Sequence, residues 1–340
     1  MRTVDPNVVL PLLSSVTSFV FAGFVFSQWL ERRRSFQLVW AIGLLWYGIS
    51  AGTEFLGSAF GWSEPLYRTW YLIGAFFVAA YLGMGTIYLL ARTRFGYFVA
   101  ATLLIGGLFG LSIRGRYPDA GTLATTVIAF AVIAATLVAV TTWRKREWSA
   151  HAAMTVLVLG SLGAAYLVLT AAIGTPGWAL DPATHVPVGE RIPGAIRVLA
   201  APFNIAGALT LVAGALFSAY VFMPKRKVLR GRALPPIVAQ VYGAIAVAVN
   251  FLASLPLAWA ALMRGELHSR VPATMLIALG GFIPGVTSGL NRFGITWAFF
   301  LGELLGVLLI FAGFLVSTEV FASRIGLGRM TVLERRSPAA

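Results

Sequence analysis

The sequence of 340 residues has no cysteine, only 3 histidines and only 12 acidic residues. The absence of cysteine excludes disulfides, thiol catalysis and thiolate metal sites, and it leaves the compartment undetermined. The histidines have neither the spacing of a zinc protease nor the mid-membrane placement that a membrane haem requires. Charged residues make up 11% of the chain and hydrophobic residues 59%, so a soluble domain of ordinary composition is excluded.

Ten long apolar runs fill most of the chain, each near the roughly 20 residues that an α-helix needs to cross a bilayer. They cover 7–30, 36–62, 69–91, 97–113, 122–142, 151–174, 198–223, 236–262, 273–290 and 295–318. The runs predict an all-α, polytopic transmembrane helix bundle of about ten helices, or nine if the ninth run is re-entrant. We expect one transmembrane domain over 1–318 and a short basic tail over 319–340.

The distribution of Lys and Arg predicts the orientation, because positively charged short loops stay on the cytoplasmic side. Thirteen cations follow odd-numbered runs and seven follow even-numbered runs. The prediction is a multi-pass protein of the cytoplasmic membrane with its amino terminus outside. Four tail arginines (Arg324, Arg329, Arg335 and Arg336) would then also lie outside if all ten runs cross. Either the tail is an exception to the excess of Lys and Arg on the cytoplasmic side, or the ninth run does not cross the membrane fully.

The net charge of +14 would suggest nucleic acid in a soluble protein, but here the cations flank membrane runs and need no such partner. Beyond the bilayer itself, anionic lipid headgroups are a candidate partner for the densest cluster, Lys225, Arg226, Lys227, Arg230 and Arg232. The alternative is that these cations only determine the orientation of the chain in the membrane. Tryptophans near the ends of the runs, such as Trp62 and Trp70, are typical interface anchors.

Ionisable groups at membrane depth are the clearest sign of function, because each needs a partner or a water-filled cavity. Glu54 lies in the second run, where the expected topology puts it in the outer half. Glu303 lies in the tenth run, in the inner half. Both are candidate proton or cation sites. Alternatively, each forms a structural hydrogen bond or an ion pair, for example with Arg68 or Arg292.

Polar residues in the other runs are weaker candidates for contact with a solute. Asn250 is the most central, and Asn291 with Arg292 closes the ninth run. Asparagine between membrane helices also serves as a structural hydrogen-bonding group, contributing roughly 0.6 to 2 kcal/mol.

The ninth run contains Gly281, Pro284 and Gly285 within a short segment, a pattern that predicts a kinked or unwound helix. Close packing of a continuous helix is the alternative. The amino-acid sequence of residues 101–110 is similar to that of residues 273–285, and the sequence of residues 74–79 is similar to that of residues 243–248. These pairs suggest a 5+5 inverted repeat of the kind found in secondary transporters. A likeness between residues 22–27 and 213–218 opposes the inverted repeat, because it pairs two runs of the same direction.

Enzymatic function is disfavoured, and we expect no metal or cofactor. Asp181, His185 and Glu190 share one loop that could gather a metal, but its composition is that of a solvated loop. Two hypotheses remain. The chain is either a secondary transporter or channel for a small solute, or a non-transporting membrane protein. The second class includes a sensor that encloses an apolar ligand and an accessory or scaffold subunit.

Overall fold

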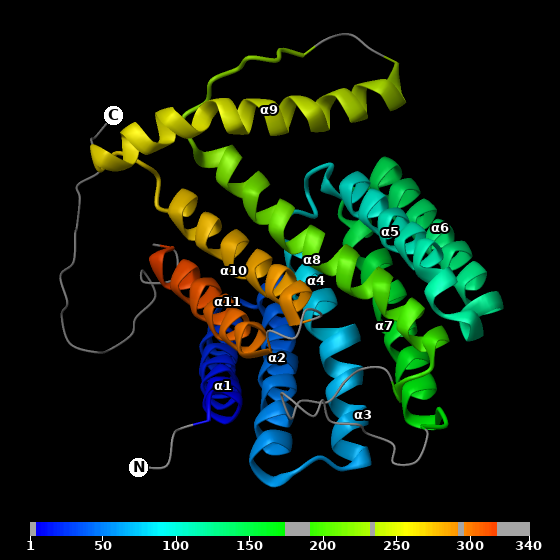
Figure 1. The fold of residues 1–340 in the computed structure, drawn as a ribbon. Coiled ribbons are helices and arrows are strands. Elements are labelled where there is room, and N and C mark those ends of the chain that lie inside the picture. The colour runs from blue at the N-terminus through cyan, green and yellow to red at the C-terminus, as the bar shows by residue number, and fades with distance from the viewer. Residues whose placement is uncertain (1–4, 174–190, 232–234, 292–295, 318–340) are drawn as a thin grey trace.

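The computed structural model describes residues 5–173, 191–231, 235–291 and 296–317, and within them the chain is helical, with no strand (Figure 1). Ten helices are long and apolar enough to cross a membrane, which makes the chain a multi-pass membrane protein. The helices are α1 Pro6–Arg32, α2 Ser35–Phe60, α3 Glu64–Leu72, α4 Val78–Leu89, α5 Phe95–Ser112, α6 Gly121–Arg144, α7 Trp148–Thr170, α8 Gly194–Phe222, α9 Pro236–Met263, α10 Arg270–Asn291 and α11 Thr296–Val316. A π-helical turn, Ile73–Phe77, joins α3 to α4, so the two form one candidate span.

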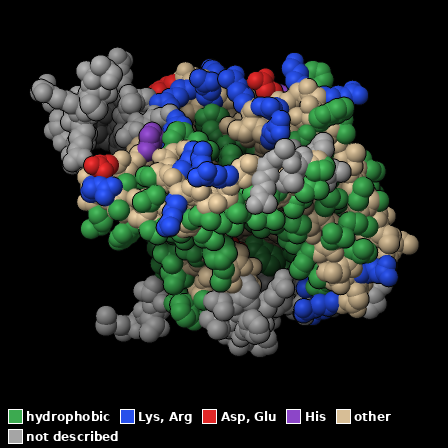
Figure 2. Space-filling model, turned by 90° about the horizontal axis from the view of Figure 1, so that it is seen from above, with side chains coloured by type: hydrophobic (Ala, Val, Ile, Leu, Met, Phe, Trp, Pro, Cys, Tyr) green, Lys and Arg blue, Asp and Glu red, His purple; other side chains and the backbone are tan. Residues whose placement is uncertain are grey.

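Helix α9 differs from the others because it lies across one end of the bundle (Figure 1). Figure 2 looks onto this end of the molecule, where Lys and Arg side chains are spread among hydrophobic ones. We call it the α9 face. The predicted inverted repeat pairs α9 with the span Glu64–Leu89, which lies inside the bundle. The repeat stays a prediction, and this difference in placement gives it no support.

The first two helices form an antiparallel hairpin. Asp5 caps α1 by accepting a hydrogen bond of 2.9 Å from the main-chain nitrogen of Asn7. Near the middle of the pair, the Ser15 hydroxyl donates to the main-chain oxygen of Gly48 at 2.8 Å. At the other end, Gln37 Nε2 donates to Gln28 Oε1 at 3.3 Å. These bonds fix the register of α1 against α2.

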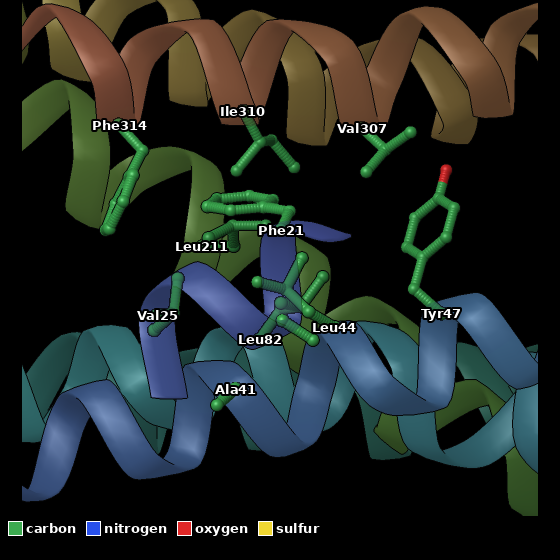
Figure 3. Packing of buried hydrophobic residues seen from close by; sticks show 11 residues of the cluster. Phe21, Val25, Ala41, Leu44, Tyr47, Leu82, Leu211, Val307, Ile310 and Phe314 are labelled. Atoms are coloured by element: carbon green, nitrogen blue, oxygen red, sulfur yellow. The ribbon is translucent and has the colours of Figure 1, made fainter. Parts of the chain in front are cut away.

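One core cluster joins this hairpin to α4, α8 and α11 (Figure 3). Its members are Phe21, Ala22, Val25, Ala41, Leu44, Tyr47, Leu82, Leu211, Val307, Ile310 and Phe314. In Figure 3 the order Ala41, Leu44, Tyr47 along α2 faces the order Phe314, Ile310, Val307 along α11. Helices α2 and α11 are therefore antiparallel, so the end of α2 lies near the start of α11.

Helix α8 packs against α4 at a point where two glycines let the main chains approach. A methyl group added at Gly83 would collide with the main chain of Gly207. Nearby, Asn204 Nδ2 donates to the main-chain oxygen of Ala75 at 2.7 Å. This oxygen belongs to the π-helical turn, where the ordinary helical hydrogen-bonding pattern is shifted. Asn204 thus stabilises the turn from α8.

Helix α10 is continuous over Arg270–Asn291 with Pro284 inside it, so the ninth run is not unwound, and a kink at Pro284 stays a prediction. Its glycines mediate close packing against α11 instead. A Cβ added at Gly280 would lie 2.6 Å from the main-chain oxygen of Gly306, and one added at Gly306 would lie 2.5 Å from the Pro284 ring. Gly281 faces Leu211 of α8. The small residues bring three helices together without breaking one.

Candidate functional site

Glu54 and Glu303 lie together, whereas the sequence-based topology placed them in opposite halves of the membrane. Glu54 is in the last two turns of α2 and Glu303 is in the first two turns of α11. Because these helices are antiparallel, the last turns of α2 lie beside the first turns of α11, and this brings the two residues together (Figure 3). The two carboxyl groups are close enough for their charges to interact.

Aromatic side chains hold the acid pair in place. Trp70 Nε1 donates a hydrogen bond of 2.9 Å to Glu54 Oε1. The Tyr47 hydroxyl donates to the main-chain oxygen of Glu303 at 2.8 Å. The Trp62 ring stacks edge-on against Trp70 with centroids 5.8 Å apart. Trp62 is only 9% exposed, so the prediction that it is an interface anchor is wrong.

The pair is largely covered by protein but incompletely hydrogen-bonded. Glu54 is 1% exposed, and Glu303 is partly buried. The second carboxyl oxygen, Oε2, of both Glu54 and Glu303 has no hydrogen-bond partner in the structure, and neither does the nearby Trp62 Nε1. Buried polar atoms of this kind are normally satisfied by protein, water or an ion. The site therefore has unused capacity to bind a proton, a water molecule or a small cation.

The chemistry of two adjacent carboxyl groups restricts what the site does. A carboxylate has no donor, so a hydrogen bond between two carboxyl groups requires a proton on one of them. Two carboxylates without that proton repel each other and form a cation-binding site instead. The same pair can thus exchange a proton for a monovalent cation, or simply bind and release a proton.

The arginines expected as partners of the glutamates are engaged elsewhere or lie outside the described residues. Arg68 Nε and Nη2 bond Glu64 Oε1 at 2.9 and 2.6 Å. Its two terminal nitrogens also donate to the main-chain oxygens of Val168 and Ala171 at the end of α7. Arg292 lies outside the described residues. Asn291 ends α10, and its side chain is not described.

Asn250 is not part of this site. It lies in α9, at the other end of the bundle, and its amide binds the main chain of residues 228 and 229. Tyr47 and Trp70 were missed as site residues. Their only signal in the sequence is that each is a polar aromatic residue within a membrane run, a feature shared with many interface anchors.

A second feature is an apolar cavity of about 650 Å³ between α4, α5, α6, α7 and α8. Its wall includes Phe130, Ala134, Gly163 and Phe203, and its few polar groups are hydroxyls such as Thr210. This volume is within the roughly 300 to 1,000 Å³ of small-molecule sites. Phe130 and Leu159 on its rim are more than 60% exposed, so the cavity opens sideways toward lipid.

Within the described ranges, no group of three His, Asp or Glu side chains is placed to hold a metal ion. Asp181, His185 and Glu190 lie outside those ranges. No protein-family model, curated protein or solved structure matches the chain.

Proposed function

We propose that the chain is a secondary transporter of the cytoplasmic membrane, in which Glu54 and Glu303 bind and release the coupling proton or cation. The observation that carries this proposal is the acid pair itself, with a buried and unpaired oxygen on each carboxyl group. Ionisable groups at membrane depth are costly, and ion and proton pathways are a common reason for their presence. The amino terminus is outside in this proposal, which puts the acid pair in the outer half.

The neighbourhood of the pair supports coupling to the rest of the bundle. One turn before Glu54, the Ser50 hydroxyl lies close to Gly74, where an added Cβ would be 3.0 Å away. Gly74 belongs to the π-helical turn that Asn204 stabilises from α8. Such turns are frequent at functional sites. Glu54 is thus one helical turn from Ser50, which lies beside the π-helical turn, and this turn contacts α8. A change of charge at Glu54 has a short route to α8.

The apolar cavity supports a solute of low polarity as the transported species. Helices α4 and α8 line it and also border the π-helical turn. Protonation of the pair would neutralise charge in a dry region and favour closure of α2 onto α11. In this mechanism the acid pair drives the helices, and the cavity holds the solute.

The proposal is tested by infrared spectroscopy of the purified protein in liposomes during pH titration. A functional pair gives a carboxyl C=O band that appears and disappears reversibly, and the band is lost in both Glu54→Gln and Glu303→Gln. Glu147→Gln is the matched control, since the Glu147 side chain is 58% exposed and lies on a loop. Proton uptake driven by a membrane potential should fall in both pair variants and persist in the control.

A band that does not respond to pH while the protein stays folded would make the pair structural. The same conclusion follows if either Gln variant fails to assemble in detergent. In that case the second candidate function applies, a non-transporting sensor that encloses an apolar ligand, which the 650 Å³ cavity favours.

The sensor candidate has its own test. A Cβ added at Gly163 meets nothing within 4 Å, so Gly163→Leu fills the cavity without a collision. Mass spectrometry of organic extracts should find an apolar compound with the wild type and much less with Gly163→Leu. Gly285→Leu, at another open glycine but outside the cavity, should retain the compound. Ligand retention without any proton response would favour sensing over transport.

A further inference from the structure

We infer that α9 is an in-plane helix of the cytoplasmic membrane surface, and that the segment Lys225–Gly231 beside it binds the phosphate of an anionic phospholipid. We call this segment the strap. The inference is independent of the acid pair and of transport. It rests on the packing of α8 against α10, on the two faces of α9, and on the cations of the strap.

The packing of α8 against α10 excludes a crossing by α9. The Arg270 guanidinium lies 4.6 Å from the Phe222 ring, so the start of α10 is beside the end of α8. Further along, Gly281 faces Leu211. The two helices are therefore antiparallel. Neighbouring helices that both cross the membrane in opposite directions have an even number of crossings between them. Since α9 alone joins them, it contributes none.

The antiparallel pairing of α2 with α11 gives the same result independently (Figure 3). If all ten candidate spans crossed, α2 and α11 would run in the same direction, as second and tenth. With nine crossings, α11 runs outward to inward and ends on the α9 face. The conflict between the tail arginines and the positive-inside rule then disappears, because α11 ends on the cytoplasmic side.

The positive-inside rule agrees with nine crossings. Arg264 and Arg270, which ten crossings place outside, join the strap on the cytoplasmic side. The cations that remain outside within the described ranges are Arg68, Arg114, Arg116, Arg191 and Arg197. Of these, Arg68 is bonded to Glu64, and the Arg197 guanidinium lies 4.7 Å from the Tyr117 ring.

One face of α9 is apolar and exposed. Val241, Ile245, Leu252 and Trp259 recur at helical spacing and are each more than 50% exposed. The helix has no charged residue between Pro236 and Met263. At the end of a membrane bundle, the apolar medium available to such a face is the boundary between headgroups and acyl chains, where in-plane helices lie.

The opposite face of α9 is buried and binds the strap. Asn250 Oδ1 accepts hydrogen bonds from the main-chain nitrogens of Val228 and Leu229, at 2.7 and 2.9 Å, and its Nδ2 donates to the oxygen of Leu229 at 2.8 Å. Ser254 accepts from the nitrogen of Arg226, and Tyr242 donates to the oxygen of Arg230. The strap is thus fixed along the helix by its main chain.

Because its main chain is bound, the strap presents its side chains outward. Lys225, Arg226, Lys227 and Arg230 are all exposed. In-plane helices usually carry Lys and Arg on their own polar face. Here the strap supplies these charges to a helix that lacks them. Arg232, the fifth cation of the cluster, lies outside the described residues.

A hollow between the strap, α8 and α9 is the site for the phosphate. Its volume is about 580 Å³, and its wall includes Lys227, Arg230, Tyr220 and Asn250. Two cations and a tyrosine hydroxyl are suitable partners for a phosphate group. Ala246, Val247 and Asn250 of α9 line this hollow, so it lies on the side of the helix opposite the exposed apolar face. With the apolar face resting on the acyl chains, the hollow is at the level of the headgroups, and this position favours a phospholipid as the occupant.

The first experiment uses the cysteine-free chain to map topology. Single cysteines replace Lys227 and Glu266, on either side of α9, and a membrane-impermeant maleimide is added to sealed vesicles of each orientation. We expect both to react from the same side as a cysteine at Lys145 and from the side opposite to one at Gly115. Reaction of the two from opposite sides would show that α9 crosses and would overturn the inference.

The second experiment measures depth with spin labels at Val241, Ile245, Leu252 and Trp259 in the full-length protein. The first and last positions would differ by roughly 27 Å along a crossing helix. An in-plane helix gives all four nearly the same shallow depth. A steady change of depth from one surface, through the centre, to the other contradicts it.

The third experiment identifies the lipid. Native mass spectrometry of protein from bilayers of phosphatidylcholine with phosphatidylglycerol should show retained phosphatidylglycerol. The double variant K227Q/R230Q should lose this preference severalfold, whereas R144Q/R146Q, on the loop between α6 and α7, should keep it. An unchanged preference in K227Q/R230Q overturns the lipid site. Displacement of the lipid by glycerol phosphate alone would indicate a site for soluble phosphates and would also overturn it.

Discussion

The Tyr47 hydroxyl donates a hydrogen bond of 2.8 Å to the main-chain oxygen of Glu303. This bond links α2 to α11 beside the two glutamates, and Tyr47 also packs near Val307 in the core (Figure 3). The oxygen of a residue in the first turns of a helix ordinarily accepts only within that helix. A donor from another helix therefore fixes the position of Glu303 relative to Glu54.

Replacing Tyr47 by Phe removes this bond and keeps the ring. We expect a loss of roughly 1 kcal/mol in the free energy of unfolding. We also expect a shift of the carboxyl infrared band, because Glu303 is less firmly held beside Glu54. Tyr166→Phe, at a side chain that is 69% exposed, is the control and should change neither quantity. Unfolding in detergent with increasing denaturant measures the first effect.

The glycines of α10 predict opposite results for two neighbouring substitutions. Gly280→Ala puts a methyl group 2.6 Å from the main-chain oxygen of Gly306, so α10 and α11 must separate, at a cost of about 1 to 3 kcal/mol. Gly285→Ala meets nothing within 4 Å and should stabilise the helix by up to about 1 kcal/mol. Thermal unfolding in detergent compares them. Equal effects would mean that α10 and α11 do not pack closely in solution.

The sequence predicted the helices well, because length and hydropathy are local properties that decide whether a helix can cross a bilayer. It could not distinguish α9 from a crossing helix. The composition of α9 is that of a span, and what sets it apart is that Asn250 and Ser254 bind the main chain of the strap. Such contacts follow from tertiary packing and leave little trace in a hydropathy profile.

The candidate site was predicted in part. Glu54 and Glu303 were identified because an ionisable residue in an apolar run is rare. Their pairing was missed, because the depth of Glu303 was counted with α9 as a crossing helix. Helix α10 continues through Pro284 without the unwinding that the sequence suggested, and the reason is its packing. Proline and glycine lower helix propensity, but packing of Gly280 and Gly306 between two helices offsets that loss.

Asn250→Ala should release the strap and leave the bundle folded. The substitution removes three hydrogen bonds to residues 228 and 229, each contributing about 1 kcal/mol. Local opening should then increase on the order of 10²-fold. Limited trypsin digestion after Lys227 and Arg230 measures the opening. Ser254→Ala, which loses the bond from Arg226, should show a smaller increase. Cleavage at the wild-type rate in both variants would mean that the strap is not held by α9.

Arg68 lies on α3, at the end of the bundle away from α9, and its loss should destabilise the bundle strongly (Figure 1). Its side chain is only 12% exposed and donates to Glu64 and to the last carbonyl oxygens of α7, at Val168 and Ala171. A cation at this position satisfies groups that a helix end leaves unpaired and complements the helix dipole. Because Arg68→Met removes these bonds and leaves two buried oxygens unsatisfied, we expect a loss of about 3 kcal/mol. The control is Arg264→Met, whose ion pair with Glu266 is mostly exposed and should contribute less than about 1 kcal/mol. Denaturant unfolding of both variants decides the matter, and a similar small loss in each would show that α3 does not hold the end of α7.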